Sequence, residues 1–206
     1  NPIDKSIWAG SYGGGLVHFK DNNIQIYKGS NSTLQPAIGD INSYRISGLA
    51  FDANNNLWIS NYAAPQNLQV RKQDGSFKAF TIPFTHFENA ISQLVVDDAN
   101  QIWIVSPRGN GIFCYNYGNS IDALNDDQWK YIRSGIGSGN LPSNNVYCLA
   151  KDKNGLLWIG TDKGIAVIQC TNEIFTQSCD AIKPIVQQGA FAGFLFQDEE
   201  VQCIAV

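Results

Sequence analysis

The sequence predicts an all-β fold built from a repeated, four-stranded antiparallel unit. Tryptophan recurs in four similar apolar motifs, at Trp8, Trp58, Trp103 and Trp158, with spacings of 50, 45 and 55 residues. An apolar alternation that ends in an acid and a polar turn precedes three of these motifs, and a turn with a second short strand follows each of them. A repeat of this length with four short strands is typical of a β-propeller blade.

Each expected strand is a short run rich in Val, Ile, Phe, Tyr and Trp, bounded by Gly, Asn, Asp or Pro. The first strands and their turns are expected at 46–56, 91–101 and 146–155, the tryptophan strands at 6–11, 56–61, 101–106 and 156–161, the next strands at 15–19, 67–71, 111–115 and 164–168, and the outer strands at 24–27, 77–80 and 129–132. No segment shows the apolar period of a helix.

The repeats predict one propeller region over 1–206 with about four blades, each a four-stranded antiparallel sheet. The repeat units lie near 1–45, 46–90, 91–145 and 146–200. Residues 201–206 match the first strands of the other repeats and are expected to begin a further blade. They could instead close a four-bladed ring against 6–11, but we favour part of a larger propeller of the seven-bladed type.

Acids near the first turn of each repeat are expected to close a tight hairpin. Asp52, Asp98 and Asp152 occupy this place, and Asp accepts local backbone hydrogen bonds in such turns. The tryptophans that follow are expected to pack between blades, because large aromatic side chains dominate core burial.

Composition excludes several classes of partner. Of the 206 residues, 44% are apolar and 16% charged, and the net charge is −4. No basic block interrupts this balance, so a nucleic-acid partner is not expected. The longest apolar runs are far shorter than the roughly 20 residues of a membrane helix, so no membrane-spanning segment is expected in this chain.

The stretch "LPSNNV" followed by "LAKDKNGLLWIGTDKGIAVI", within 141–168, resembles the two-component regulator propeller repeat. Such repeats occur in the periplasmic sensor halves of bacterial hybrid histidine kinases, and similar repeats occur in some secreted surface proteins. The resemblance is strongest in the fourth repeat. Ser60 and Val105 stand where the family often has Gly.

A narrower resemblance covers 165–206. The Cys-to-Cys insertion before "KPIV", then "FAGFLF" and a glutamate before "VQCIAV", is similar to the PorZ-like propeller family of the type IX secretion attachment complex. The resemblance implies a cell-surface protein whose partners are other secretion proteins and a surface glycolipid, with anionic lipopolysaccharide presented to a sortase. In that family a further repeat follows "IAV" directly, which favours the larger propeller.

The predicted function is a non-enzymatic propeller of a cell-envelope protein, at the cell surface or in the periplasm, acting in recognition or scaffolding. The resemblance suggests a type IX secretion component whose partners are envelope proteins or a surface glycolipid or oligosaccharide. One alternative is the periplasmic glycan-sensing propeller of a hybrid two-component histidine kinase. Another is a propeller enzyme of the lactonase or lyase type, which would need an axial metal or carboxylate cluster that the sequence does not indicate. No cofactor is expected.

Five cysteines are present, and two of them suggest a disulfide. Cys170 and Cys179 flank the excursion "TNEIFTQS", and a disulfide across it would imply an oxidising compartment. Cys114, Cys148 and Cys203 fall at strand positions and are expected as buried thiols that behave as small apolar side chains.

The expected ligand-binding face gathers side chains from turns that emerge on one face of a propeller. Its members are Tyr12, Tyr62, Arg108, Asn110, Asp162 and Lys163, with Tyr44, Arg45 and His86 from the neighbouring loops. Aromatic, Arg and Asn side chains around an axial depression suit a polar ligand such as a glycan or a partner loop. Ordinary polar turn residues are the competing interpretation. The two histidines, His18 and His86, lie in different repeats without a nucleophile motif, so neither a catalytic residue nor a metal site is expected.

Overall fold

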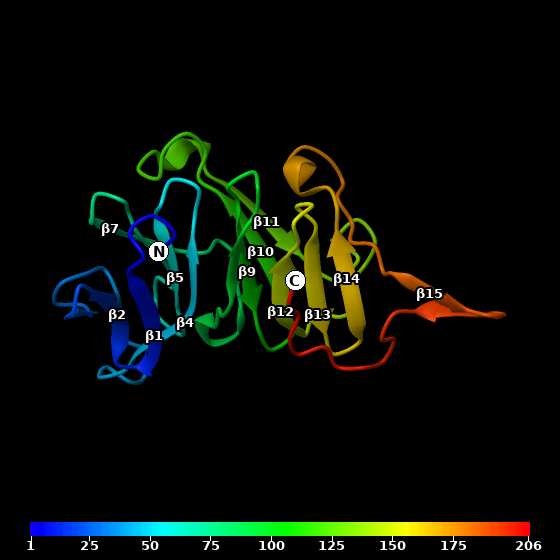
Figure 1. Ribbon diagram of the computed structural model, residues 1–206, viewed down its shortest axis with the longest axis horizontal. Coiled ribbons are helices and arrows are strands. Elements are labelled where there is room, and N and C mark those ends of the chain that lie inside the picture. Colours follow the sequence, from blue (N-terminus) through cyan, green and yellow to red (C-terminus); the bar gives the residue numbers. More distant parts are fainter. The chain divides into compact units, whose positions relative to one another are not determined.

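The structure is all-β, with strands that pair in antiparallel sheets (Figure 1). The computed structural model describes the backbone of residues 1–206 and every side chain except that of Leu124. The chain divides into two compact units, Asn1–Leu94 and Val95–Val206. The only helices among the described residues are the short 3₁₀ turns η1 (Phe87–Asn89), η2 (Leu124–Asp126) and η3 (Thr171–Glu173). None of these has the length and apolar character of a membrane span.

The first unit contains a seven-stranded sheet in the order β3-β2-β1-β4-β5-β6-β7. Its strands are β1 (Ile7–Gly13), β2 (Gly15–Lys20), β3 (Asn23–Tyr27), β4 (Tyr44–Phe51), β5 (Leu57–Asn61), β6 (Leu68–Arg71) and β7 (Phe77–Phe80). The first three belong to the first predicted repeat and the other four to the second. The two repeats meet where β1 and β4 pair through Tyr12 with Arg45 and Gly13 with Tyr44.

The second unit contains a four-stranded sheet, β11-β10-β9-β8, a three-stranded sheet, β12-β13-β14, and the hairpin β15-β16. The strands are β8 (Leu94–Val96), which begins at the unit boundary, β9 (Ile102–Ser106), β10 (Gly111–Asn116), β11 (Gln128–Ile132), β12 (Val146–Lys151), β13 (Leu157–Thr161), β14 (Gly164–Ile168), β15 (Ile185–Gln188) and β16 (Phe191–Phe194). The repeated strand pattern is therefore present as the sequence predicts, in a propeller-like arrangement of antiparallel sheets.

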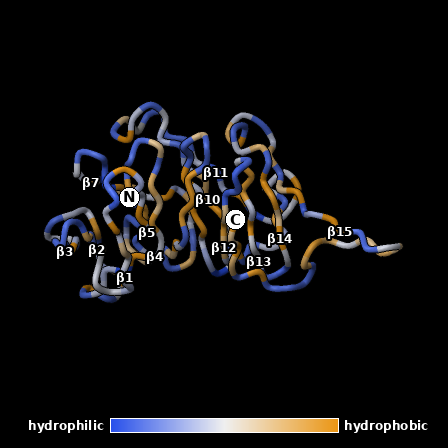
Figure 2. Tube along the Cα trace, viewed as in Figure 1, coloured by the Kyte–Doolittle hydropathy of each residue, from blue (hydrophilic) through white to orange (hydrophobic). Residues whose placement is uncertain are grey.

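Apolar side chains of successive sheets form the core of each unit. In the first unit, Leu16 and Ile59 belong to one buried cluster, against which Trp8 packs. In the second unit, Trp103 is fully buried in a cluster with Ile112 and Leu157, which come from different sheets. Figure 2 shows apolar residues concentrated along the strands and hydrophilic residues in the connecting loops. Trp103 thus packs between sheets, as predicted.

An acid six residues before the tryptophan holds the first turn of three repeats. Asp97 Oδ1 accepts from the Gln101 N–H at 2.9 Å, and its Oδ2 accepts from Trp103 Nε1 at 2.7 Å. Asp52 and Asp152 accept the same two kinds of bond in their own repeats. The prediction of Asp98 for this role was wrong. The acceptor must reach both the turn N–H groups and the indole N–H, and Asp97, six residues before Trp103, does so. Asp98 instead forms an exposed ion pair with Lys151.

The first repeat replaces this contact with a relay. The position six residues before Trp8 is Pro2, which offers no side-chain acceptor. Trp8 Nε1 donates to Ser6 Oγ at 3.1 Å, and Ser6 Oγ donates to Asp4 Oδ1 at 2.7 Å. A carboxylate therefore still terminates the chain of bonds from the indole, although it lies closer in the sequence.

The outer strand of the fourth repeat is reduced to a single bridge. Val167 and Ile182 exchange two backbone hydrogen bonds of 2.8 Å. Pro184 follows, and because proline has no backbone N–H it cannot continue the ladder. The chain instead leaves as the hairpin β15-β16, which extends away from β14 in Figure 1 and exposes Phe191 and Ile185.

Residues 201–206, predicted as a strand, are not in a strand. The Val201 N–H donates to Thr161 O at 2.9 Å, and Cys148 Sγ lies 3.6 Å from Val201 O. A strand needs a ladder of backbone hydrogen bonds along its length, and residues 201–206 do not form one. That these residues begin a further blade stays a prediction.

Two of the three unpaired cysteines are buried, as expected, and one is not. Cys114 and Cys148 are buried, whereas Cys203 is exposed. Burial raises the pKa of the Cys114 thiol well above its usual value, and burial also raises that of Cys148. The prediction for Cys203 was wrong because it assumed that 201–206 packs as a strand.

Candidate functional site

Two predicted ligand-binding residues of the first unit lie in contact. Tyr12 lies near the end of β1 and is 66% exposed, and Tyr62 directly follows β5. Their ring centroids are 5.8 Å apart and the rings are tilted by 54°. The Tyr62 N–H donates to the carbonyl of Arg45 at 2.8 Å, and Tyr12 pairs with Arg45 between β1 and β4. The sheet therefore brings together two tyrosines that lie 50 residues apart in the chain.

Arg45 completes this cluster. Its guanidinium carbon lies 5.2 Å from the centroid of the Tyr12 ring. Nη2 donates to Asp40 Oδ2 at 3.1 Å, and Nε donates to Ser43 Oγ at 3.1 Å. We call Tyr12, Tyr62, Arg45 and Asp40 the tyrosine platform. The sequence predicted Arg45 on this face but did not indicate Asp40 and Ser43. The available signal was the stretch "DINSYR", in which an acid lies only five residues before the arginine.

Two neighbouring residues of the predicted face, Tyr44 and His86, make contacts within the first unit. Tyr44 packs against the core of the first unit, with Lys28 Nζ 5.9 Å from its ring centroid. His86 Nδ1 lies 2.7 Å from Phe84 O, and its Nε2 lies 2.6 Å from Asn67 Nδ2. Burial lowers the pKa of His86, which favours the neutral ring with Nδ1 as donor and Nε2 as acceptor. His86 therefore supports its loop.

The predicted residues of the second unit lie in two turns, Arg108 and Asn110 between β9 and β10 and Asp162 and Lys163 between β13 and β14. Asn110 Nδ2 donates to Pro107 O at 2.7 Å, which closes the turn between β9 and β10. Arg108 occupies that turn with a φ of 62°. Lys163, after β13, lies beside a surface hollow of about 220 Å³ whose other lining residues are Pro142, Ile165, Lys183, Phe194, Leu195, Gln197 and Asp198.

Asp162 is tied to the preceding loop. Its Oδ2 accepts from Asn145 Nδ2 at 2.8 Å, and its N–H donates to Asn145 O at 3.2 Å. Burial acts to raise the pKa of Asp162, but hydrogen bonds with Ser143 and Asn145 and the charge of Lys163 outweigh it, so the pKa is lowered. Asp162 is thus an ionised turn residue. That these residues and the tyrosine platform line one axial depression stays a prediction.

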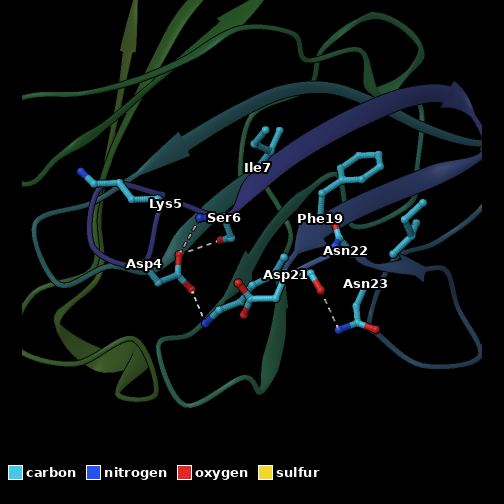
Figure 3. A pocket seen from close by; sticks show the side chains of 10 residues that line it. Asp4, Lys5, Ser6, Ile7, Phe19, Asp21, Asn22 and Asn23 are labelled. Atoms are coloured by element: carbon cyan, nitrogen blue, oxygen red, sulfur yellow. Dashed lines mark hydrogen bonds and ion pairs between the residues drawn. The ribbon is translucent and has the colours of Figure 1, made fainter.

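A larger surface hollow of about 490 Å³ lies at the start of the first unit (Figure 3). Ser6 donates from both its N–H and its hydroxyl to Asp4 Oδ1, and Lys20 donates to Asp4 Oδ2 at 3.1 Å. The hydrogen bonds of Ser6 lower the pKa of Asp4, and Lys20 adds to the effect. These polar groups therefore form hydrogen bonds with one another. The sequence did not predict a site at this hollow. Among the described residues no group of three or more His, Cys, Asp and Glu side chains could hold a metal ion.

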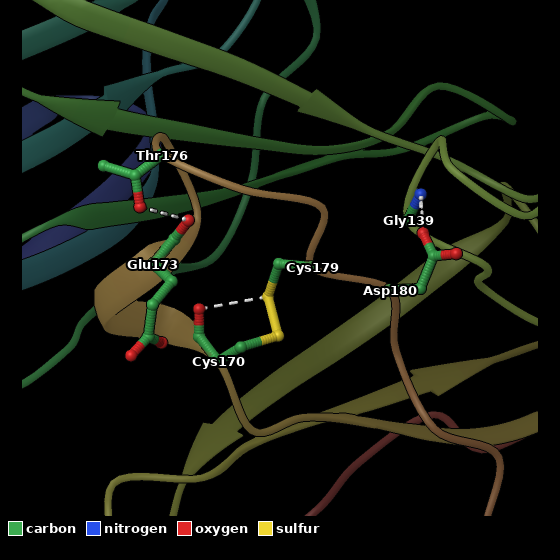
Figure 4. The surroundings of a disulfide bond; sticks show 6 residues. All are labelled: Gly139, Cys170, Glu173, Thr176, Cys179 and Asp180. Carbon is green, nitrogen blue, oxygen red and sulfur yellow. Dashed lines mark hydrogen bonds between the residues drawn. A yellow bond between two sulfur atoms is a disulfide. The ribbon is translucent and has the colours of Figure 1, made fainter.

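The disulfide between Cys170 and Cys179 is present, as predicted. Figure 4 shows the loop that it closes and the neighbouring Asp180. Asp180 Oδ1 accepts from the Gly139 N–H at 3.0 Å and thereby fastens the residues after the disulfide to the loop before β12. The disulfide and this bond therefore hold the insertion against the body of the second unit.

Comparison with known proteins shows a shared repeat and a shared fold. Residues 140–163 match the family model described as two component regulator propeller. Among curated proteins, none matches this chain in sequence.

The solved structure of PorZ, an essential surface component of the type-IX secretion system of Porphyromonas gingivalis, matches 100% of this chain with a TM-score of 0.85 and 20% identity. The extracellular domain of a hybrid two component system from B. thetaiotaomicron matches 91% of the chain with a TM-score of 0.59 and 23% identity. Virginiamycin B lyase from Staphylococcus aureus matches 88% with a TM-score of 0.60 and 13% identity.

The chain spans only a part of each of these proteins. It covers 29% of the PorZ chain, 24% of the two-component protein and 53% of the lyase. At these identities the likeness concerns the fold. The chain is therefore a propeller-like, antiparallel all-β protein that carries a two component regulator propeller repeat at residues 140–163 and resembles PorZ over its whole length.

Proposed function

We propose that this chain is a non-enzymatic recognition or scaffolding module of a cell-surface protein that acts in type IX secretion. The observation that carries the proposal is the match to PorZ over the whole chain, with a TM-score of 0.85. In this proposal the sheets are blades of a larger propeller, of the seven-bladed type. The partners are other secretion or envelope proteins, or a surface glycolipid or oligosaccharide.

One feature of the chain supports a role outside the cytoplasm, and another supports a role in recognition. The Cys170–Cys179 disulfide suits an oxidising compartment, because the cytosol keeps most thiols reduced. The tyrosine platform presents an exposed aromatic ring beside a charged pair, which suits binding of a polar partner rather than a chemical reaction.

Deletion of the gene in the source bacterium tests the secretion role. We expect proteins with type IX sorting signals to lose their surface attachment, measured by fractionation and surface labelling, and to regain it when the gene is restored. A matched strain with an unrelated envelope propeller deleted serves as the control. Normal surface attachment of the cargo in the deletion strain would overturn the secretion role.

A periplasmic sensor of a hybrid two-component system is the second candidate. The observation that favours it is the propeller repeat at 140–163 together with the match to the hybrid two component system domain. In that case the deletion abolishes transcription induced by an oligosaccharide and leaves cargo attachment intact. The likeness to virginiamycin B lyase concerns the fold, and no reaction is assigned from it.

A further inference from the structure

We propose that the tyrosine platform binds a neutral sugar ring of a glycan. The proposal deepens the recognition role proposed above and rests on it. It goes further in assigning the binding to Tyr12, Tyr62, Arg45 and Asp40 of the first unit and in naming a neutral, hydroxyl-rich ring as the ligand.

The apolar half of such a site is the Tyr12 ring. This side chain is 66% exposed, yet it is held in place by the neighbouring Tyr62 ring and by the guanidinium of Arg45. A fixed, exposed aromatic ring offers a flat apolar surface at little cost in conformational entropy. One face of a pyranose ring carries C–H groups and packs on such a surface.

The polar half is the Arg45–Asp40 pair. Arg45 uses Nη2 for Asp40 and Nε for Ser43, and its Nη1 has no hydrogen-bond partner among the described residues. Within the same described set, Asp40 Oδ1 accepts no side-chain hydrogen bond. A donor and an acceptor thus stand side by side. Vicinal hydroxyl groups, which both donate and accept, match this pair.

Charge selects a neutral ligand over an anionic one. Asp40 lies 3.1 Å from Arg45, and their side chains are 45% and 25% exposed, so the carboxylate offsets the positive charge at the surface. A phosphate or carboxylate that approached Nη1 would meet the negative charge of Asp40 at short range. A sugar hydroxyl pays no such penalty.

The backbone organises the platform before any ligand arrives. Tyr12 and Arg45 are paired strand residues, and the Tyr62 N–H bonds to the Arg45 carbonyl. The loop that carries Asp40 is closed by the bond from Ala37 N–H to Ser43 O at 2.9 Å. Binding to a preformed site avoids the entropy cost of ordering loops. The same loop exposes the apolar side chains of Ile38 and Ile41.

Titration of the whole chain with defined saccharides tests the proposal. The probes are mannotriose, maltotriose, cellotriose and xylotriose as neutral ligands and trigalacturonate as the anionic one, with affinity from calorimetry and ligand contact from saturation-transfer NMR. We expect at least one neutral trisaccharide to bind. Tyr12→Ala should weaken its binding at least tenfold, whereas Tyr12→Phe, which keeps the ring, should stay within about twofold.

Two further variants separate the site from general effects. Tyr147→Ala removes an exposed tyrosine of the second unit and should leave affinity unchanged. Asp40→Asn removes the charge that opposes anions and should raise the affinity for trigalacturonate severalfold, with the fold checked by circular dichroism. The proposal is overturned if no neutral probe binds, if Tyr12→Ala binds as the parent does, or if the parent prefers trigalacturonate.

The two proposals fail in different ways. Saccharide binding that depends on Tyr12, together with normal cargo attachment in the deletion strain, would remove the secretion role and keep the sugar site. Lost cargo attachment that a Tyr12→Ala gene fully restores, with no saccharide bound by the parent, would keep the secretion role and remove the sugar site. The sugar site would also be overturned if no saccharide binds and the Tyr12→Ala variant instead loses the binding of a partner protein.

Discussion

The indole N–H of Trp103 donates a 2.7 Å hydrogen bond to the buried carboxylate of Asp97. Trp58 bonds to Asp52, and Trp158 to Asp152, at 3.0 Å in each case. Each acid also accepts backbone N–H bonds from the turn between the first two strands of its repeat. In each of these repeats one carboxylate therefore joins the turn to the tryptophan, and in the third repeat this tryptophan packs between sheets.

Asp97→Ala is expected to destabilise the protein by about 2–3 kcal/mol, because it leaves the buried Trp103 indole N–H and turn N–H groups without their acceptor. The neighbouring Asp98→Ala loses only an exposed ion pair with Lys151 and should cost less than about 1 kcal/mol. Urea unfolding monitored by tryptophan fluorescence measures both. Equal losses in the two variants would contradict this assignment.

The pKa values of the equivalent acids Asp97 and Asp152 should be shifted in opposite directions from the usual aspartate value. Burial raises the pKa of Asp97, whereas the hydrogen bond from Trp158 lowers that of Asp152. The side-chain carbonyl ¹³C shifts, followed against pH, should place the Asp97 midpoint above 3.8 and the Asp152 midpoint below it. Coincident midpoints would show that the two sites have the same environment.

The two shifts act on stability with opposite signs. Asp152 has a folded-state pKa below its unfolded value, so its contribution is present above the unfolded pKa and is lost as pH falls through the folded pKa. Asp97 has a folded-state pKa above its unfolded value. Its ionisation therefore opposes folding at neutral pH, and this penalty is relieved as pH falls from the folded pKa towards the unfolded one.

Loss of the Cys170–Cys179 disulfide should destabilise the protein by about 2–3 kcal/mol, since the disulfide restricts a short loop in the unfolded chain. The double variant Cys170→Ser, Cys179→Ser should match the parent measured in dithiothreitol, and dithiothreitol should not change the variant further. Thr176→Ala, in the same exposed loop, is the matched control. An unfolding midpoint that does not move in the double variant would refute the stabilising role.

Thiol reactivity should separate the three unpaired cysteines. Cys203 is exposed and should react with Ellman's reagent in the native protein, whereas Cys114 and Cys148 are buried with raised pKa values and should react only after unfolding. Peptide mass spectrometry after brief alkylation identifies the labelled residue. Native labelling of Cys114 at the rate of Cys203 would show that the core of the second unit opens readily.

The sequence by itself determined the repeat. Apolar alternation, the recurring tryptophans and the Gly, Asn and Asp turns predict strands that the structure has at nearly the same residues, because these patterns depend on local backbone preference and on which face is buried. The disulfide was also predictable, since Cys170 and Cys179 flank one short excursion. The acid–tryptophan spacing was available too, because six residues separate the pair in three repeats and would have selected Asp97 over Asp98.

Only the tertiary structure decided which side chains meet. Tyr12 and Tyr62 come from different repeats, and the pairing of β1 with β4 at Arg45 brings them together, while Asp40 and Ser43 fix the guanidinium. The glycine at position 160 is likewise explained only by the tertiary structure, because a Cβ there would clash with the carbonyl oxygen of Val201, 41 positions later. Local sequence sets strands and turns, but long-range packing and pairing set the contacts of a site, and these depend on register between distant segments.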